Sequence, residues 1–217
     1  ENSKYKDRIH MDCYPYAAGS STLDLSQVDE RVKILITWSE AHPKMSKKYL
    51  HTIAKEWDVS LIEAAKKLQP AGAVYFSISE EDMHKIISHP KTMIGSDGLP
   101  HDPHPHPRLW GTFPKVLGRL SREQKLFTLS SAIHKMTGLS AANFNLLNRG
   151  LIKKGHYADI VVFDPEEIDD QSTFEKPIKM SKGIEMVFVN GTETFNNGSL
   201  TGNRNGCYVG NKKQISK

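Results

Sequence analysis

Hydrophobic and polar positions alternate along residues 46–69 with the periodicity of two short helices. Apolar residues at helical spacing predict the first helix: Leu50, Ile53, Ala54 and Trp57. Ser60 and Glu63 have the spacing of a capping box, which predicts that a second helix begins there and continues to Leu68. Pro70 follows, and it ends the helical pattern.

Shorter apolar runs on both sides of this helix pair predict strands. Lys33–Trp38 and Ala73–Ile78 are rich in residues that favour β structure. Glu80–Ile87 has an acidic first turn, and we expect a helix with its apolar residues on one face: Met83, Ile86 and Ile87. Thr92–Ile94 then predicts a brief buried strand. The order is strand, two helices, strand, helix, strand.

The second half of the chain predicts two further helices and a β-rich end. Ser121 and Gln124 suggest another capping box before an amphipathic helix with apolar residues at Leu129, Ala132, Ile133 and Met136. We expect Ser140 to cap a helix through Leu147. Strands are predicted at Ile160–Phe163 and Ile184–Val189, with Asn-Gly turns at Asn190-Gly191 and Asn197-Gly198.

Composition is that of an ordinary globular protein, with 38% hydrophobic and 25% charged residues among 217. No apolar run approaches the roughly 20 residues of a membrane helix, so we expect no membrane partner. The net charge of +4 is spread along the chain and does not favour nucleic acid. Cys13 and Cys207 lie far apart, which suggests reduced thiols and makes the cytoplasm the default location.

An aspartate between two glycines, Asp97, is the first candidate for chemistry. Gly95 directly follows the predicted strand Thr92–Ile94, and Gly98 directly follows the aspartate. Glycines permit a sharp turn, so Asp97 would stand at the carboxyl end of the strand, where α/β barrels place catalytic groups. An ordinary Asp-Gly turn is the alternative, and this spacing alone favours it.

Several motifs, in order along the chain, resemble the D-aminoacylase (N-acyl-D-amino-acid deacylase) family of the amidohydrolase superfamily. The tract at 95–113 carries Gly-Ser-Asp-Gly-Leu-Pro-His-Asp and then Pro-His-Pro-Arg-Leu-Trp-Gly-Thr-Phe. Further matches lie at 12–22, 68–73, 134–141 and 155–165. The resemblance covers about residues 8–209 and implies a (β/α)₈ barrel followed by a small β domain.

A complete barrel of this type takes roughly 250 residues, so we expect this chain to be the C-terminal part of a longer enzyme. By analogy, Arg8–Cys13 would be the seventh barrel strand and the region of Thr92 to Asp97 the eighth. The fold class is then α/β. We expect residues 1–150 to complete the barrel, with inserted helices between its last two strands, and residues 151–217 to form the β domain and tail.

The family resemblance implies zinc-assisted hydrolysis of the amide bond of N-acyl-D-amino acids. Asp97 would be the catalytic carboxylate, and Tyr14, Ser20 and Arg108 would bind the substrate carboxylate from two loops. An arginine fork suits that carboxylate because it donates two parallel charged hydrogen bonds. The zinc ligands of the family lie on earlier strands, so we expect none in this chain and no activity from it in isolation. Acyl preference and oligomeric state leave no trace in the sequence.

His101 to Pro107 invites a metal-binding interpretation that the alternating prolines oppose. They favour a polyproline II path, which rotates successive histidines apart. We therefore expect a loop over the active-site mouth, with His101 as a residue that could line it.

Two rival hypotheses come from other classes of protein. The chain could be a short, non-catalytic amidohydrolase-like binding protein. Residues 50–69 could instead form a helix-turn-helix DNA binder, although the second helix opens with Leu61, Ile62 and Glu63 rather than basic residues.

Overall fold

The computed structural model describes residues 9–210 of the chain. Strands, given in order, are β1 Met11–Cys13, β2 Gly19–Thr22, β3 Lys33–Ser39, β4 Ala71–Phe76, β5 Thr92–Ile94, β6 Ile160–Phe163, β7 Ile184–Val189, β8 Thr192–Asn196 and β9 Ser199–Leu200. Helices are α1 Leu50–Trp57, α2 Leu61–Leu68, α3 Glu80–Ser88, α4 Arg108–Lys115, α5 Leu129–Met136 and α6 Gly138–Asn143. Short 3₁₀ turns lie at Leu25–Gln27 and Pro43–Met45, and a π-helical stretch at Val116–Glu123 extends α4.

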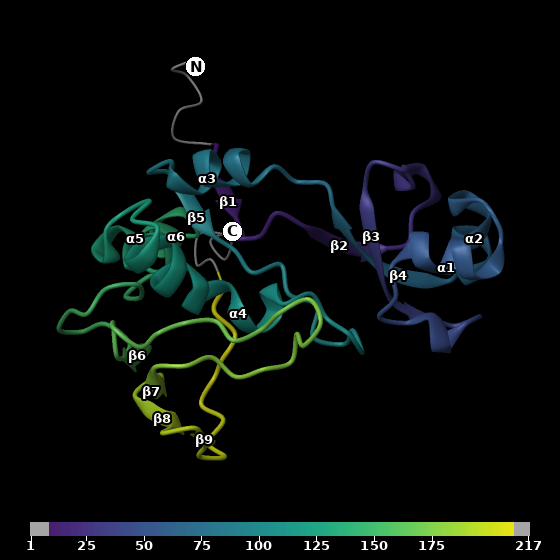
Figure 1. The fold of residues 1–217 in the computed structure, drawn as a ribbon. Coiled ribbons are helices and arrows are strands. Elements are labelled where there is room, and N and C mark those ends of the chain that lie inside the picture. Colours follow the sequence, from purple (N-terminus) through teal and green to yellow (C-terminus); the bar gives the residue numbers. More distant parts are fainter. Residues whose placement is uncertain (1–8, 211–217) are drawn as a thin grey trace, which may run out of the picture.

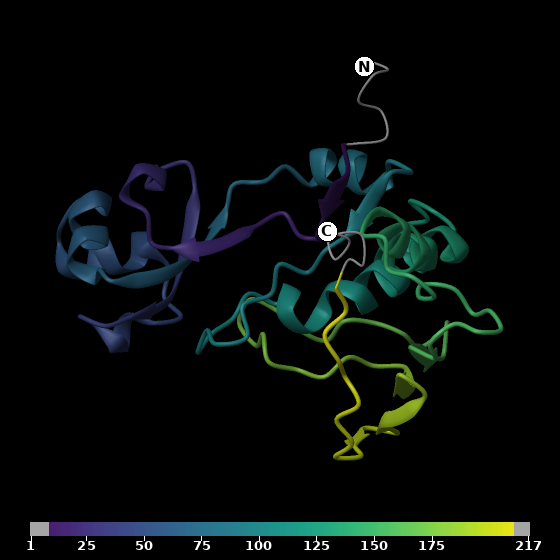
Figure 2. The ribbon, with the colours of Figure 1, turned by 180° about the vertical axis from the view of Figure 1, so that it is seen from behind.

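The segment from β2 to β4 forms a separate body, which we call the insertion (residues 19–76). Its sheet has the order β2-β4-β3 with antiparallel pairing, and α1 and α2 pack on it (Figure 1). The predicted helices and strands are confirmed, and so is the capping box at Ser60 and Glu63. β4 begins at Ala71, two residues earlier than expected. The view from behind shows the insertion joined to the rest of the molecule by two extended connections (Figure 2).

β1 and β5 pair in parallel, with Met11 opposite Thr92 and Cys13 opposite Ile94. The prediction of a strand at Thr92–Ile94 is confirmed. Arg8, the expected start of the first strand, lies outside the described residues. α3 precedes β5 as predicted, but the expected apolar face is partly wrong, because Met83 and Ile87 are buried while Ile86 is 47% exposed.

The helices after the site begin at other residues than expected. Ser121 caps no helix, because it lies inside the π-helical stretch and its hydroxyl donates to the Phe127 carbonyl. Thr128 caps α5 instead. Ser140 lies within α6, which ends at Asn143 rather than Leu147. Both errors arise because a serine with polar neighbours fits a capping pattern wherever it occurs.

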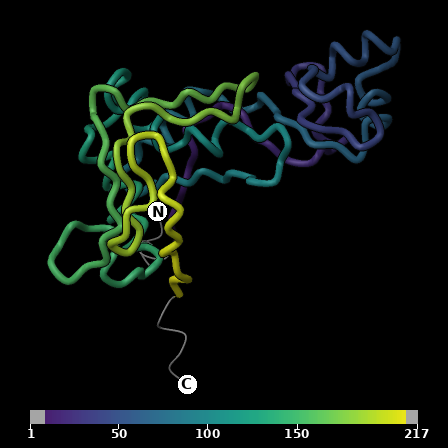
Figure 3. The backbone as a smooth tube through the Cα atoms, turned by 90° about the horizontal axis from the view of Figure 1, so that it is seen from below, coloured from purple at the N-terminus to yellow at the C-terminus, as the bar shows by residue number. Residues whose placement is uncertain are grey.

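The C-terminal part holds a four-stranded antiparallel sheet of order β6-β7-β8-β9. The turns predicted at Asn190-Gly191 and Asn197-Gly198 join its hairpins, and all four residues have positive φ. Seen from below, this sheet and the insertion occupy opposite ends of the molecule (Figure 3). Among the described helices, none is both long and apolar enough to cross a membrane. The predicted end of the second domain, 211–217, lies outside the described residues.

Candidate active site

Asp97 stands three residues after β5, in a turn with little room around its backbone. Its φ of 47° is left-handed, a conformation that aspartate tolerates better than most residues. A Cβ at Gly95 would lie 2.6 Å from Asp12 Oδ2, and one at Gly98 would lie 2.7 Å from Leu109 Cδ1. The two glycines therefore let this turn pack closely against β1 and α4. The Asp97 side chain remains 66% exposed.

Arg108 lies at the start of α4, so the expectation that it belongs to a loop is wrong. Its side chain is 2% exposed, and its Nη2 lies 2.8 Å from Asp97 Oδ2. Its Nε is buried and has no hydrogen-bond partner among residues 9–210. A buried donor without a partner is destabilising unless a ligand satisfies it. Nη2 of the guanidinium therefore pairs with Asp97, whereas the Nε–H has no acceptor among residues 9–210.

Tyr14 and Ser20 contact the same guanidinium. The Arg108 guanidinium carbon lies 4.7 Å from the centre of the Tyr14 ring, a cation–π distance. Arg108 Nη2 also donates to the backbone carbonyl of Ser20 at 3.4 Å. Ser20 was expected in a loop but lies on β2. The three other residues that the sequence proposes for the site thus all contact Arg108, Ser20 through its backbone carbonyl.

The histidine-rich segment before α4 is a loop, as predicted, and its histidines point to different partners. His104 Nε2 bonds to the Phe174 carbonyl at 2.8 Å, and His106 Nε2 bonds to the Ala18 carbonyl at 3.0 Å. Both side chains are buried. His101 is exposed, and no hydrogen bond or ion pair among residues 9–210 joins it to Arg108. His104 and His106 are therefore committed to backbone carbonyls rather than to a metal.

No group of three or more His, Cys, Asp or Glu side chains within residues 9–210 could hold a metal ion. Cys13 is a free thiol that donates to the Tyr14 carbonyl. Burial, and then the charge of Asp12, raise the pKa of this thiol, which disfavours a metal-binding thiolate. The described residues do not fit the zinc that the family resemblance implies.

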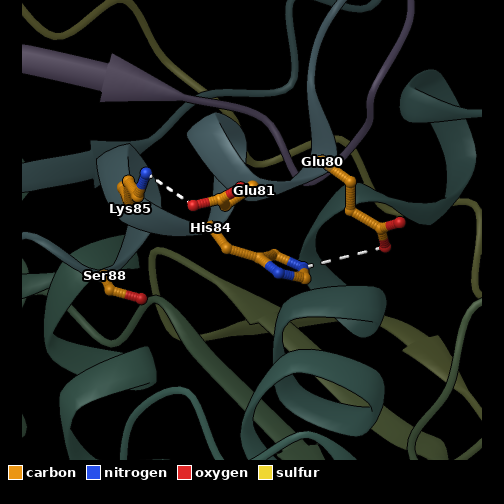
Figure 4. Close-up of a pocket in the computed structure, with 5 residues that line it drawn as sticks. All are labelled: Glu80, Glu81, His84, Lys85 and Ser88. Atoms are coloured by element: carbon orange, nitrogen blue, oxygen red, sulfur yellow. Dashed lines mark ion pairs between the residues drawn. The ribbon is translucent and has the colours of Figure 1, made fainter.

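A separate open hollow of about 670 Å³ lies over α3 (Figure 4). Its lining residues all come from that helix: Glu80, Glu81, His84, Lys85 and Ser88. Two pairs at i,i+4 spacing dominate it, Lys85 with Glu81 at 2.7 Å and His84 with Glu80 at 3.8 Å. Such pairs are ordinary on a solvated helix face. This hollow includes none of the predicted site residues.

Comparison with known proteins shows the family to which the chain belongs. Residues 36–195 match the model of the amidohydrolase family. The chain belongs to that family. Over 195 residues, or 90% of the chain, it is 46% identical to an N-acyl-D-aspartate deacylase from Alcaligenes xylosoxydans xylosoxydans. Over 206 residues, or 95% of the chain, it is 45% identical to a D-aminoacylase from the same organism.

Solved structures of amidohydrolases superpose on most of the chain. A crystal structure of D-aminoacylase matches with a TM-score of 0.90 and 48% identity over 93% of this chain. An N-acyl-D-glutamate deacylase from Bordetella bronchiseptica, complexed with zinc and a phosphonate inhibitor, matches with a TM-score of 0.84 and 45% identity over 88% of it. The chain covers 43% and 40% of those two structures. It likewise spans about two fifths of the length of the curated relatives, 39% and 43%.

Proposed function

We propose that this chain is the C-terminal part of a zinc-dependent N-acyl-D-amino-acid deacylase. The observation that carries the proposal is the buried Arg108 guanidinium, whose Nε has no partner in the part of the chain that the structure describes and which lies beside the aspartate that follows β5. A buried arginine with a free donor suits a carboxylate. An N-acyl amino acid carries such a carboxylate next to the amide that is to be cleaved.

In this proposal β1 and β5 are the last two strands of a (β/α)₈ barrel, and residues 19–76 are inserted between them. Their parallel pairing supports it, since neighbouring strands of such a barrel run parallel. Residues after about 151 would form the small β domain that follows. Catalytic groups of barrels lie at the carboxyl ends of the strands, where Asp97 stands.

The proposed chemistry divides between Asp97 and Arg108. Arg108, with Tyr14 and the β2 strand at Ser20, would hold the substrate carboxylate and so fix which enantiomer presents its amide to Asp97. Asp97 would accept a proton from a water molecule while the water oxygen bonds to the acyl carbonyl carbon, and it would deliver that proton to the leaving amine nitrogen. The carbon–nitrogen bond then breaks and leaves a carboxylate and a D-amino acid. The zinc would need ligands from outside the described residues.

The test uses the natural full-length protein with a panel of N-acetyl-D-amino acids, including the D-aspartate and D-glutamate derivatives, and their L enantiomers as controls. We expect hydrolysis of D substrates only. Asp97→Asn should lower kcat by roughly 100-fold to 10,000-fold, because the proton carrier is lost. Asp58→Asn is the matched control, since Asp58 also has a left-handed φ, 52°, but caps α1 in the insertion.

The isolated 217-residue chain should be inactive and poorly soluble, because β1 and β5 have open edges. Unchanged activity in Asp97→Asn, or hydrolysis of L and D substrates alike, would overturn the proposed function.

A further inference from the structure

His106 makes two hydrogen bonds that fix the state of its imidazole ring. Nε2 bonds to the Ala18 carbonyl at 3.0 Å, so it must be the protonated nitrogen. Nδ1 accepts the backbone N–H of Arg108 at 3.0 Å. A neutral ring with its proton on Nε2 satisfies both bonds, and a protonated ring would lose the second. The ring thus bonds two backbone groups that are distant in sequence, the Ala18 carbonyl and the Arg108 N–H.

The His106 ring also lies at the meeting point of segments that are distant in sequence. Tyr16 packs edge-on against it at 5.1 Å between ring centres, Phe174 does so at 5.0 Å, and Tyr14 is tilted at 6.2 Å. Two of these aromatic residues, Tyr14 and Tyr16, belong to the connection between β1 and β2. The His106 side chain therefore links the connection between β1 and β2 to the start of α4.

The surroundings of His106 keep it neutral. Burial, and then the positive charge of Arg108, lower its pKa to about 3. A neutral imidazole avoids repulsion with the neighbouring guanidinium and keeps Nδ1 available as an acceptor. Both ring nitrogens are also engaged with backbone groups, which favours a role in positioning rather than in proton transfer.

We propose that His106 is a positioning residue. It holds Arg108 and the connection between β1 and β2, which carries Tyr14, in the relative position that binds the substrate carboxylate. This inference rests on the proposed function, because it assigns Arg108 to that carboxylate. His106 acts through Arg108 and touches no reacting atom. Its loss should therefore weaken substrate binding more than it slows the chemical step.

His104 provides a matched control two residues earlier. It is equally buried, at 4% exposure, and also bonds a backbone carbonyl, that of Phe174. No bond of His104 reaches Arg108 or Tyr14 within residues 9–210. A comparison of His106→Phe with His104→Phe therefore separates the loss of a buried hydrogen bond from the loss of this particular connection.

The experiment measures KM and kcat in the natural full-length enzyme. His106→Phe should raise KM about tenfold and change kcat less, since a buried N–H of Arg108 loses its acceptor. In His106→Asn the KM should return most of the way to the wild-type value, because an Asn side chain can accept the N–H of the residue two positions later. His104→Phe should leave KM within about twofold. Loss of folded protein alone would lower kcat at unchanged KM.

A second measurement serves if His106→Phe does not fold. In wild-type protein labelled with ¹⁵N-histidine, NMR should find His106 protonated on Nε2 and not titrating between about pH 5 and 8. The inference is overturned by a ring that titrates in that range, or by equal KM in His106→Phe, His104→Phe and wild type. A wild-type enzyme that hydrolyses no substrate would instead overturn the proposed function, and the NMR result would still decide the state of His106.

Discussion

The insertion differs from the site region, which comprises β1, β5 and the start of α4, in how its segments are held together. The insertion is antiparallel, and its core draws on neighbouring strands and helices: Leu23, Ile34, Ile36, Leu50, Ile53, Ala54, Ala64, Ala65, Leu68, Ala71, Ala73 and Tyr75. The site region depends on β1 and β5, two three-residue strands that meet only after the whole insertion has intervened. The helix and β3–β4 contacts of the insertion join segments closer in sequence than those of the site, where Arg108 reaches Ser20 across 88 residues, and contacts between distant segments form more slowly.

Charge distinguishes the same two regions. Ion pairs of the insertion, such as Lys48 with Glu56, lie at the surface, where each contributes little. Arg108 in the site is 2% exposed and pairs with Asp97. A charge buried to this degree is kept only with partners around it, so its removal should affect binding and structure together. The charged groups of the insertion are thus mostly solvated, whereas the Arg108 guanidinium is buried beside Asp97.

Arg108→Lys should produce the largest change in this comparison. Lysine keeps the charge but loses the planar fork, so KM for an N-acyl-D-amino acid should rise about 100-fold in the full-length enzyme. A substrate whose carboxylate is blocked as a methyl ester should show a much smaller change, because it lacks the group that Arg108 is proposed to bind. Steady-state kinetics with the acid and the ester measure both values.

Arg31→Lys is the control for that substitution, because Arg31 pairs with Asp29 on the surface of the insertion and is 89% exposed. It should leave KM unchanged for both substrates. Equal effects of Arg108→Lys on acid and ester would mean that Arg108 does not recognise the carboxylate.

Leu50→Ala should destabilise the insertion by about 2–5 kcal/mol and leave the site region protected. Leu50 is fully buried in the insertion core, and truncation there leaves a cavity. Ile62→Ala, at a side chain 37% exposed, should change stability by less than about 1 kcal/mol. Hydrogen exchange read separately over residues 19–76 and over β1 and β5 measures both. Simultaneous loss of protection in both regions would show that the insertion has no independent stability.

Periodicity predicted the insertion well because its signals are local. Helical spacing placed α1 and α2, and the Ser60–Glu63 box placed the start of α2. β2 was missed because Gly19–Thr22 carries no apolar pattern and becomes a strand only by pairing with β4. The Ser121 error has the same origin, since a residue buried beside Phe127 and within a π-helical stretch cannot be distinguished from a cap by spacing.

The sequence proposes members of a candidate site but does not show how they contact one another. The glycines on either side of Asp97 predict a sharp turn, and the resemblance to the family adds Tyr14, Ser20 and Arg108 as candidate site residues. No pattern in the sequence indicates that Arg108 would be buried or would pair with Asp97, because these contacts join β2, β5 and α4 across the fold. The hydrogen bond from the Arg108 N–H to His106 was not expected from the sequence either, and the place of His106 two residues before a candidate arginine was the available signal.

Ser60→Ala should give the smallest effect, about 1 kcal/mol of stability, felt in the insertion alone. The Ser60 hydroxyl accepts the Glu63 N–H, and the Glu63 carboxylate accepts from Ser60 in return. Because these hydrogen bonds hold the pKa of the Glu63 carboxyl below its usual value, their contribution is present near neutral pH and is lost as pH falls. The difference between wild type and Ser60→Ala should therefore shrink in acid.

Gln124→Ala is the control for that substitution, since Ser121 and Gln124 have the spacing of a capping box without forming one. It should change stability by less than about 0.5 kcal/mol at every pH. Denaturant unfolding combined with hydrogen exchange at the first turn of α2 measures the effect. A difference between wild type and Ser60→Ala that persists unchanged below the pKa of Glu63 would mean that the serine hydroxyl acts alone, and that the carboxylate contributes nothing to the start of this helix.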